Sequence, residues 1–211
     1  MKKIQETQNK IVTSDKFVLS ETAKIQYSYG LKHVIRYVVE REEEIGTESV
    51  AEHVYALHLL ADYFLPLEDS EQKMDWSKIH DMLQYHDIDE IETGDIIGYL
   101  KTESQKAEEA KAMERVILRF PEHLQGKIQK VIREYDEQIT SEAKFAKALD
   151  RIEPLFQIFN QNGKKILKLQ NTTRKQSWEH KEPYLKSYKY LFRFLTVIEE
   201  TMENEGYFSQ S

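Results

Sequence analysis

The sequence lacks cysteine altogether and has little glycine or proline. Without cysteine, its 211 residues cannot form disulfides, cysteine-ligated zinc sites or thiol nucleophiles. Seven glycines, four prolines and an apolar fraction of 40% exclude a collagen-like or disordered chain. No run of about 18 apolar residues occurs, and the polar stretch 1–15 lacks the apolar segment of a secretory signal. We therefore expect a folded, soluble, cytoplasmic protein without a membrane span.

Positive charge is also in deficit. The net charge of −7 disfavours a broad nucleic-acid surface, which needs clustered lysine and arginine. A small phosphorylated ligand is compatible with this charge, because one or two arginines beside a metal ion can hold a phosphate locally.

Apolar residues recur at helical spacing along most of the chain, and we find no strict alternation typical of a strand. The sequence therefore predicts an all-α fold. At this length we expect one domain over residues 1–211, with a core region at about 20–160 and an additional C-terminal helical segment at about 164–205. Apolar spacing and candidate caps predict helices at about 20–38, 49–65, 75–94, 103–120, 121–135 and 140–163.

The C-terminal segment follows a polar linker at 171–176. Its apolar residues alternate at spacings of four and three, which is typical of a packing seam. They are Tyr184, Tyr188, Leu191, Leu195, Ile198 and Met202. The seam could pack on its own domain or on a second copy of the chain, and the first alternative is favoured.

Two histidines fall on apolar helix faces. His53 lies four residues before Leu57, and His86 lies four residues after Met82. A buried imidazole needs a partner, and the simplest alternative to a ligand is a core histidine hydrogen-bonded to a carbonyl group.

Three carboxylates accompany these histidines. Asp87 follows the second histidine, Glu90 lies one helical turn beyond it, and Asp150 lies in a helix whose inner stripe is otherwise apolar. Charged residues are rarely buried unless they are paired or bound to a metal. For Asp150 alone, the alternative is a surface ion pair with Arg151 or Lys147.

Together, His53, His86, Asp87 and Asp150 would form a set of two nitrogen and two oxygen ligands with room for water. Such a set suits Mn, Fe, Co, Ni or Mg better than a closed structural zinc site. The spacings of an EF-hand, a zincin helix, a phosphate-cradling glycine loop and a nucleophile elbow are all absent.

Four short motifs occur in a diagnostic order. They are Glu48–His53 (Glu-Ser-Val-Ala-Glu-His), His86–Glu90 (His-Asp-Ile-Asp-Glu), Thr93–Ile96 (Thr-Gly-Asp-Ile) and Ala143–Asp150. In these motifs the sequence resembles the HD-domain phosphohydrolase family over about residues 36–156. It is most similar to the 5′-deoxynucleotidase branch, which removes phosphate from deoxyribonucleoside 5′-monophosphates.

The resemblance implies one divalent metal ion, with Mn, Co, Fe, Ni and Mg as the open choices. The implied ligands are His53, His86, Asp87 and Asp150. It also implies a homodimer.

The resemblance further implies a substrate site. Glu90 would be the catalytic carboxylate, and Arg36 would contact the phosphate during catalysis. Tyr37 would stand near the sugar, and Asp95 would contact it. Two stretches depart from the family pattern near the expected substrate entrance, namely Gly46 with the acidic residues before it, and 97–99.

These observations predict a metal-dependent phosphomonoesterase that hydrolyses (deoxy)ribonucleoside 5′-monophosphates with a metal-activated water. One alternative keeps the same centre but acts on another nucleotide or phosphate ester. The other, from a different class, is a metal-stabilised helical binding protein without turnover.

Overall fold

The computed structural model describes residues 2–37, 47–96 and 101–209, which form helices and no named β-strand. The all-α prediction is confirmed. The elements are α1 (Lys2–Thr13), α2 (Asp15–Ser28), the 3₁₀ helix η1 (Tyr29–His33), α3 (Val50–Glu68), α4 (Trp76–Tyr85), α5 (Glu90–Thr93), α6 (Glu103–Arg119), α7 (Glu122–Glu137), α8 (Ser141–Ile158), α9 (Gln161–Leu169), α10 (Arg174–Leu185) and α11 (Lys189–Asn204). Within these ranges, no helix is both long and apolar enough to cross a lipid bilayer.

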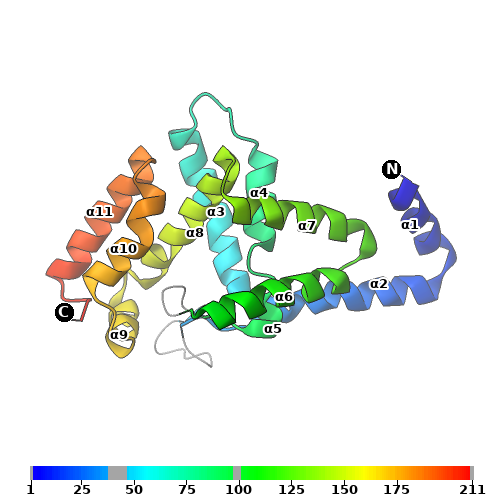
Figure 1. Ribbon diagram of the computed structural model, residues 1–211, viewed down its shortest axis with the longest axis horizontal. Coiled ribbons are helices and arrows are strands. Elements are labelled where there is room, and N and C mark those ends of the chain that lie inside the picture. Colours follow the sequence, from blue (N-terminus) through cyan, green and yellow to red (C-terminus); the bar gives the residue numbers. More distant parts are fainter. Residues whose placement is uncertain (1, 38–46, 97–100, 210–211) are drawn as a thin grey trace.

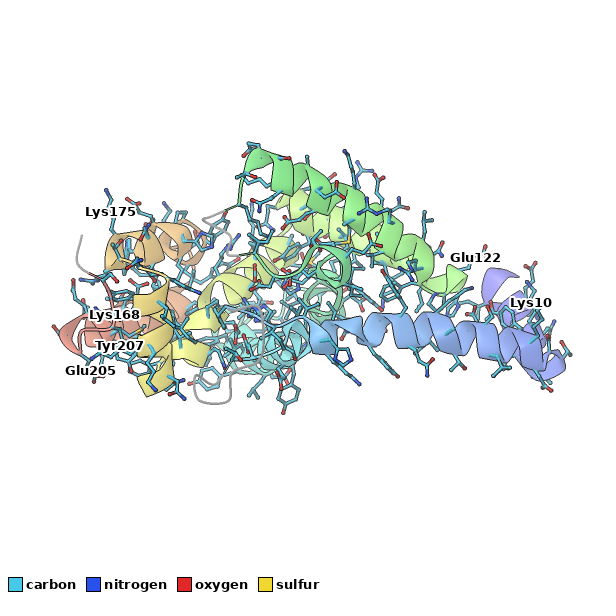
Figure 2. The ribbon with its side chains drawn as sticks, turned by 90° about the horizontal axis from the view of Figure 1, so that it is seen from below. Lys10, Glu122, Lys168, Lys175, Glu205 and Tyr207 are labelled. Carbon is cyan, nitrogen blue, oxygen red and sulfur yellow. The ribbon has the colours of Figure 1, made fainter. Side chains whose placement is uncertain are left out.

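Helices α3, α4 and α8 pack against one another at the centre of the molecule (Figure 1). Helices α9, α10 and α11 lie at one end with the C-terminus, and α1 and α2 extend from the other (Figure 1). The molecule is elongated between these two ends. Figure 2 shows it from below, with Lys10 and Glu122 at one end and Lys168 and Lys175 at the other.

The main hydrophobic core joins the central helices to the C-terminal ones. Leu57 of α3, Ile79 of α4 and Leu149 of α8 are fully buried in one cluster. Leu195 of α11 belongs to the same cluster and is also fully buried. Burying each such side chain contributes about 1.5–3 kcal/mol, so this cluster fixes how the helices are placed.

The apolar seam near the C-terminus packs on its own domain, which confirms the favoured alternative. Leu191, Leu195, Ile198 and Met202 are buried in the main core, whereas Tyr184 is 39% exposed.

The additional C-terminal helical segment expected at about 164–205 is made up of three helices, α9, α10 and α11. A capping box between Thr173 and Gln176 starts α10 at Arg174, so helix replaces half of the linker expected at 171–176.

The sixth expected helix ends earlier than the sequence suggested. Helix α8 stops at Ile158, and Gly163 lies inside α9. The side chain of Asn160 accepts hydrogen bonds from the backbone of Asn162 and Gly163 and so begins the new helix. A Cβ atom on Gly163 would lie 1.9 Å from the carbonyl oxygen of Ile158, so this close approach requires glycine.

The first expected helix is displaced toward the N-terminus. Helix α2 begins at Asp15 because the Ser14 hydroxyl accepts a hydrogen bond from the Phe17 backbone at 3.3 Å. It ends well before residue 38, since the Arg36 backbone donates to the Glu48 carbonyl at 2.9 Å in a short antiparallel bridge. Residues 38–46 lie outside the described part of the chain, as do 97–100.

Two further boundaries differ from the expected ones. The helix expected at 75–94 is interrupted, because α4 ends at Tyr85 and a tight turn precedes α5. Aspartates at 87 and 89 are poor helix formers and favour such a turn. Helix α3 was expected to end before Pro66 but continues to Glu68, since the hydrogen bond that proline cannot donate falls in the last turn.

We predict that Leu195→Ala lowers the free energy of unfolding by about 2–5 kcal/mol, because it leaves a cavity in the shared core. Leu169→Ala is the matched control, since Leu169 is 68% exposed, and it should change this free energy by less than about 0.5 kcal/mol. Urea denaturation followed by circular dichroism measures both. Equal losses in the two variants would contradict the assignment of α11 to the core.

Candidate metal centre and cavity

Two buried imidazoles face each other at the centre of the fold. His53 comes from the first turn of α3, which a capping box between Ser49 and Glu52 begins. His86 is the C-cap of α4. The two ring centroids are 5.7 Å apart, and both side chains are almost completely buried.

Each ring is held by its Nδ1 atom. His53 Nδ1 lies 2.7 Å from Glu153 Oε2, and His86 Nδ1 lies 3.0 Å from the carbonyl oxygen of Leu83. Both Nε2 atoms are buried and have no hydrogen bond of acceptable geometry among the described residues. Fixing Nδ1 in this way turns the Nε2 lone pair toward a cation, which is the usual arrangement of histidine ligands.

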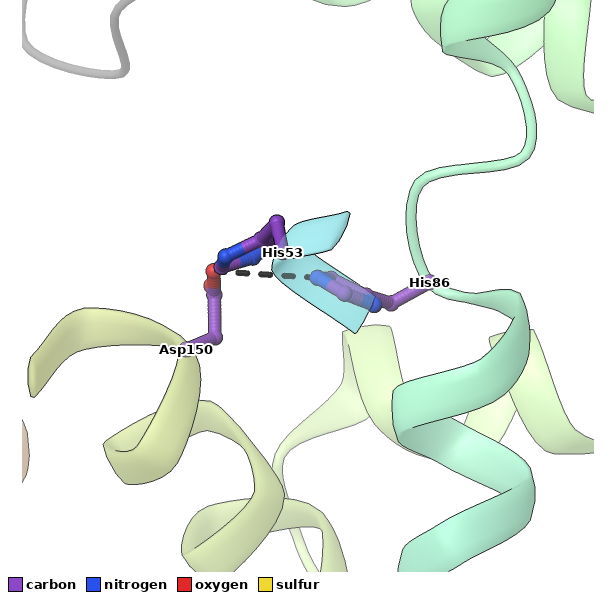
Figure 3. Close-up of side chains that lie close together, drawn as sticks. All are labelled: His53, His86 and Asp150. Atoms are coloured by element: carbon purple, nitrogen blue, oxygen red, sulfur yellow. Dashed lines mark ion pairs between the residues drawn. The ribbon is translucent and has the colours of Figure 1, made fainter. Parts of the chain in front are cut away.

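Two aspartates converge on these Nε2 atoms. Asp150 Oδ1 lies 3.6 Å from Nε2 of His53 and 3.7 Å from Nε2 of His86, as Figure 3 shows. Asp87 Oδ2 lies 3.0 Å from Nε2 of His86 and 3.9 Å from Nε2 of His53.

These separations fit a shared cation. Ligands about 2.1 Å from a metal ion are roughly 3.0–3.5 Å from one another. Small rearrangements would therefore bring the four donor atoms onto one ion, and the mixture of nitrogen and oxygen donors suits a divalent transition metal.

The second oxygen of Asp150 is occupied by protein groups. Tyr135 donates its hydroxyl to Oδ2 at 3.1 Å, and Lys147 donates to the same oxygen at 2.9 Å. The pKa of Asp150 lies well below its usual value, because Lys147 and the two histidines outweigh the opposing effect of burial. Asp150 therefore forms the ion pair with Lys147 through Oδ2 and, at the same time, faces the two histidines through Oδ1.

The nearby carboxylates determine whether the imidazole of His86 carries a proton. Burial alone would lower the pKa of His86, but Asp87 and Asp150 oppose it and raise that pKa to about 10. A cation bound here would therefore replace a proton on this imidazole.

A buried ion-pair network lies behind His53. Arg36 Nη1 donates to Glu48 Oε1 at 2.7 Å and to Glu153 Oε2 at 3.2 Å. Burial, together with the nearby Glu153 carboxylate, raises the pKa of Glu48 to about 7. The cluster of Glu48, His53 and Glu153 also has metal-like spacing, but the guanidinium of Arg36 already supplies its positive charge.

A cavity of about 340 Å³ opens beside this centre, and the substrate residues expected from the sequence line it. Glu90 is buried there, and its Oε2 atom has no hydrogen-bond partner in the described part of the chain. Burial, helped by Asp87 and Asp95, raises the pKa of Glu90 well above its usual value.

Arg36, Tyr37 and Asp95 form one corner of the cavity. Asp95 Oδ2 accepts a hydrogen bond from the Tyr37 backbone at 3.4 Å, and its Oδ1 lies 3.8 Å from Arg36 Nε. Tyr37 has a φ of 74°, a left-handed conformation that is uncommon for residues other than glycine. Strain of this kind is often found at functional sites.

The structure thus brings the eight expected residues together, although their roles in binding and catalysis stay predictions. Sequence reasoning missed other parts of the site. Glu153 was detectable, since it lies three residues after Asp150 on the same helix face. The residues that α10 contributes could not be detected from the sequence, because His180 and Lys181 reach the cavity only through tertiary packing. The two departures from the family pattern, at Gly46 and at 97–99, lie outside the described residues.

Comparison with known proteins gives consistent matches. The sequence model of the HD domain family matches residues 29–190. The 5′-deoxynucleotidase HDDC2 of Xenopus laevis is 31% identical over 113 residues, and that of Homo sapiens is 30% identical over 112. These alignments cover 52% of this chain and 53% and 52% of the two relatives, so the chain spans about half the length of the curated relatives it matches.

Two solved structures share the fold. A predicted metal-dependent phosphohydrolase from Magnetospirillum magnetotacticum superposes with a TM-score of 0.76 at 23% identity, covering 92% of this chain and 98% of the other. An HD-domain phosphohydrolase from Listeria innocua superposes with a TM-score of 0.56 at 19% identity, and the superposition covers 86% of this chain and 84% of the other.

We predict that purified protein dialysed against Mn or Co retains about one ion per chain, and that His86→Ala and Asp150→Ala each abolish this retention. The control is His123→Ala, because His123 is exposed on α7. Elemental analysis of each variant measures the bound metal. Full metal content in His86→Ala would contradict the assignment of this residue as a ligand.

Proposed function

Because this chain belongs to the HD domain family, we propose that it is a metal-dependent phosphohydrolase acting on (deoxy)ribonucleoside 5′-monophosphates. The observation that carries the proposal is the pair of buried Nε2 atoms, on His53 and His86, that face two aspartates beside a cavity. The similarity to 5′-deoxynucleotidases supports a phosphate monoester as substrate. We also propose that the protein is a cytoplasmic homodimer, since the family resemblance of its motifs implies the dimer and its lack of cysteine fits that compartment.

The four converging side chains, His53, His86, Asp87 and Asp150, would hold one divalent ion. When bound, such an ion supplies a Lewis acid and lowers the pKa of a coordinated water, so that hydroxide is available near neutral pH. Glu153 would keep the His53 ring oriented throughout, because it holds Nδ1 at 2.7 Å.

Glu90 would move the proton in the reaction. Burial, with Asp87 and Asp95 nearby, raises its pKa well above the usual value, and this favours a carboxyl group that can deliver a proton. From the cavity, this group could give its proton to the ribose 5′-oxygen as the bond from that oxygen to phosphorus breaks. The leaving group then departs as a neutral alcohol.

The corner formed by Arg36, Tyr37 and Asp95 would position the substrate. The Nε atom of Arg36 is buried without a hydrogen-bond partner in the described part of the chain, so it can donate to a phosphoryl oxygen. The carboxylate of Asp95 can accept a hydrogen bond from a sugar hydroxyl. The ring of Tyr37 would pack beside the sugar.

We predict that metal-loaded protein releases inorganic phosphate from deoxyribonucleoside 5′-monophosphates when Mn or Co is added, and that EDTA abolishes this activity. A panel that also contains ribonucleoside monophosphates and nucleoside triphosphates measures the substrate class. Release from triphosphates alone would support the alternative of another nucleotide substrate. No release from any compound, with metal bound, would support a binding protein without turnover.

We predict that Glu90→Gln lowers kcat by about 10²–10⁴-fold while the bound metal is retained, because an amide cannot transfer the proton. The matched control is Glu92→Gln on the same short helix, since Glu92 pairs with Arg115 outside the cavity. Steady-state kinetics and elemental analysis measure the two effects. Full turnover in Glu90→Gln would remove this residue from the mechanism.

A further inference from the structure

Cationic side chains line much of the cavity beside the candidate metal ligands. They are Arg36, Lys101, Lys106, Lys147, Arg151 and Lys181. All but one form ion pairs with carboxylates, at nitrogen to oxygen distances of 2.7 to 3.7 Å. Across residues 2–37, 47–96 and 101–209, Arg151 is the member of this set that forms no direct ion pair with a carboxylate, and the charge of Asp150 acts on it only at longer range.

Neutral groups hold Arg151 in place. Its Nη1 atom lies 2.6 Å from Nε2 of His180, and its guanidinium carbon lies 5.2 Å from the ring centroid of Tyr184. Burial and the charge of Arg151 lower the pKa of His180 to about 4, so this imidazole is neutral and accepts the hydrogen bond. The guanidinium is therefore oriented by contacts with neutral groups, and no carboxylate among the described residues forms an ion pair with it.

Arg151 also has unused hydrogen-bonding capacity. Its Nε atom is buried and has no partner in the described part of the chain. Arg36 differs, since its Nη1 atom is shared by Glu48 and Glu153 and its charge is already balanced. A phosphate monoester brings close to two negative charges near neutral pH, so a guanidinium with a free donor and no direct ion pair is well suited to bind it.

We propose that Arg151, oriented by His180, binds the phosphoryl group of the substrate as a second arginine of the cavity. The proposal rests on the proposed function, and it assigns a role in substrate binding to the segment after residue 160. In this arrangement Arg151 touches the substrate, and His180 is a positioning residue.

Inorganic phosphate tests this proposal without requiring turnover. Titration calorimetry of the metal-loaded protein measures its dissociation constant for phosphate. We expect Arg151→Gln to weaken phosphate binding about tenfold or more, with unchanged metal content. The control is Arg193→Gln, which removes one positive charge at an exposed position of α11 and should leave phosphate affinity unchanged.

Two further variants separate binding from structural effects. Arg151→Lys keeps the charge but loses the planar guanidinium, so an intermediate loss of phosphate affinity is expected even if Arg151→Gln does not fold. His180→Ala should raise KM while kcat at saturating substrate stays the same. His180→Gln should restore KM, because its carbonyl oxygen can accept from the guanidinium.

The proposal would be overturned if Arg151→Gln bound phosphate as tightly as the Arg193→Gln control. If Arg151→Gln does not fold, unchanged phosphate affinity in Arg151→Lys would overturn it instead. Failure of the proposed function looks different. In that case nucleotides are not hydrolysed at all, yet the calorimetric comparison of the variants still decides whether Arg151 binds phosphate.

Discussion

The site depends on two buried imidazole Nε2 atoms, of His53 and His86, which face the carboxylates of Asp87 and Asp150 and form no hydrogen bond of acceptable geometry among the described residues. Leaving such a buried polar atom unsatisfied costs about 1–3 kcal/mol, so the arrangement persists only because other contacts enforce it. Glu153 and the Leu83 carbonyl fix the two rings from behind, and the surrounding helices prevent their rotation. A bound cation would replace the proton that the carboxylates favour on His86, and it would give both Nε2 atoms a partner.

The same constraint connects the candidate metal ligands to the corner formed by Arg36, Tyr37 and Asp95. Arg36 lies in the extended segment before α3, yet its partner Glu153 lies on α8 and also holds His53. Removing one member of a buried charge network costs about 3–5 kcal/mol, because it leaves a charge without compensation. The geometry of the candidate metal ligands is therefore coupled to that of the corner formed by Arg36, Tyr37 and Asp95.

The sequence predicted which residues of the site lie together better than it predicted the backbone that carries them. The motifs identified His53, His86, Asp87 and Asp150, because polar residues on apolar helix faces need a shared partner. They could not reveal that a tight turn, and not a continuous helix, carries Asp87 toward the cavity, since helical periodicity continues through that turn.

The contributions of α10 were also beyond sequence reasoning. His180 has no motif, and its position beside Arg151 follows only from how the C-terminal helices pack on the core. The seam that ends in Met202 was predictable, because its spacing is regular, but the breaks that divide the segment into three helices depend on individual caps.

Gly163 has a consequence for how this protein can change over evolution. Helix α9 approaches the end of α8 so closely there that a methyl group has no room, and α9 leads directly into the helix that carries His180. A larger residue at this position would clash with the backbone of Ile158, so α8 and α9 would have to move apart, and Ile158 and Leu167 of these two helices line the cavity. A position outside the cavity therefore restrains the shape of its lining.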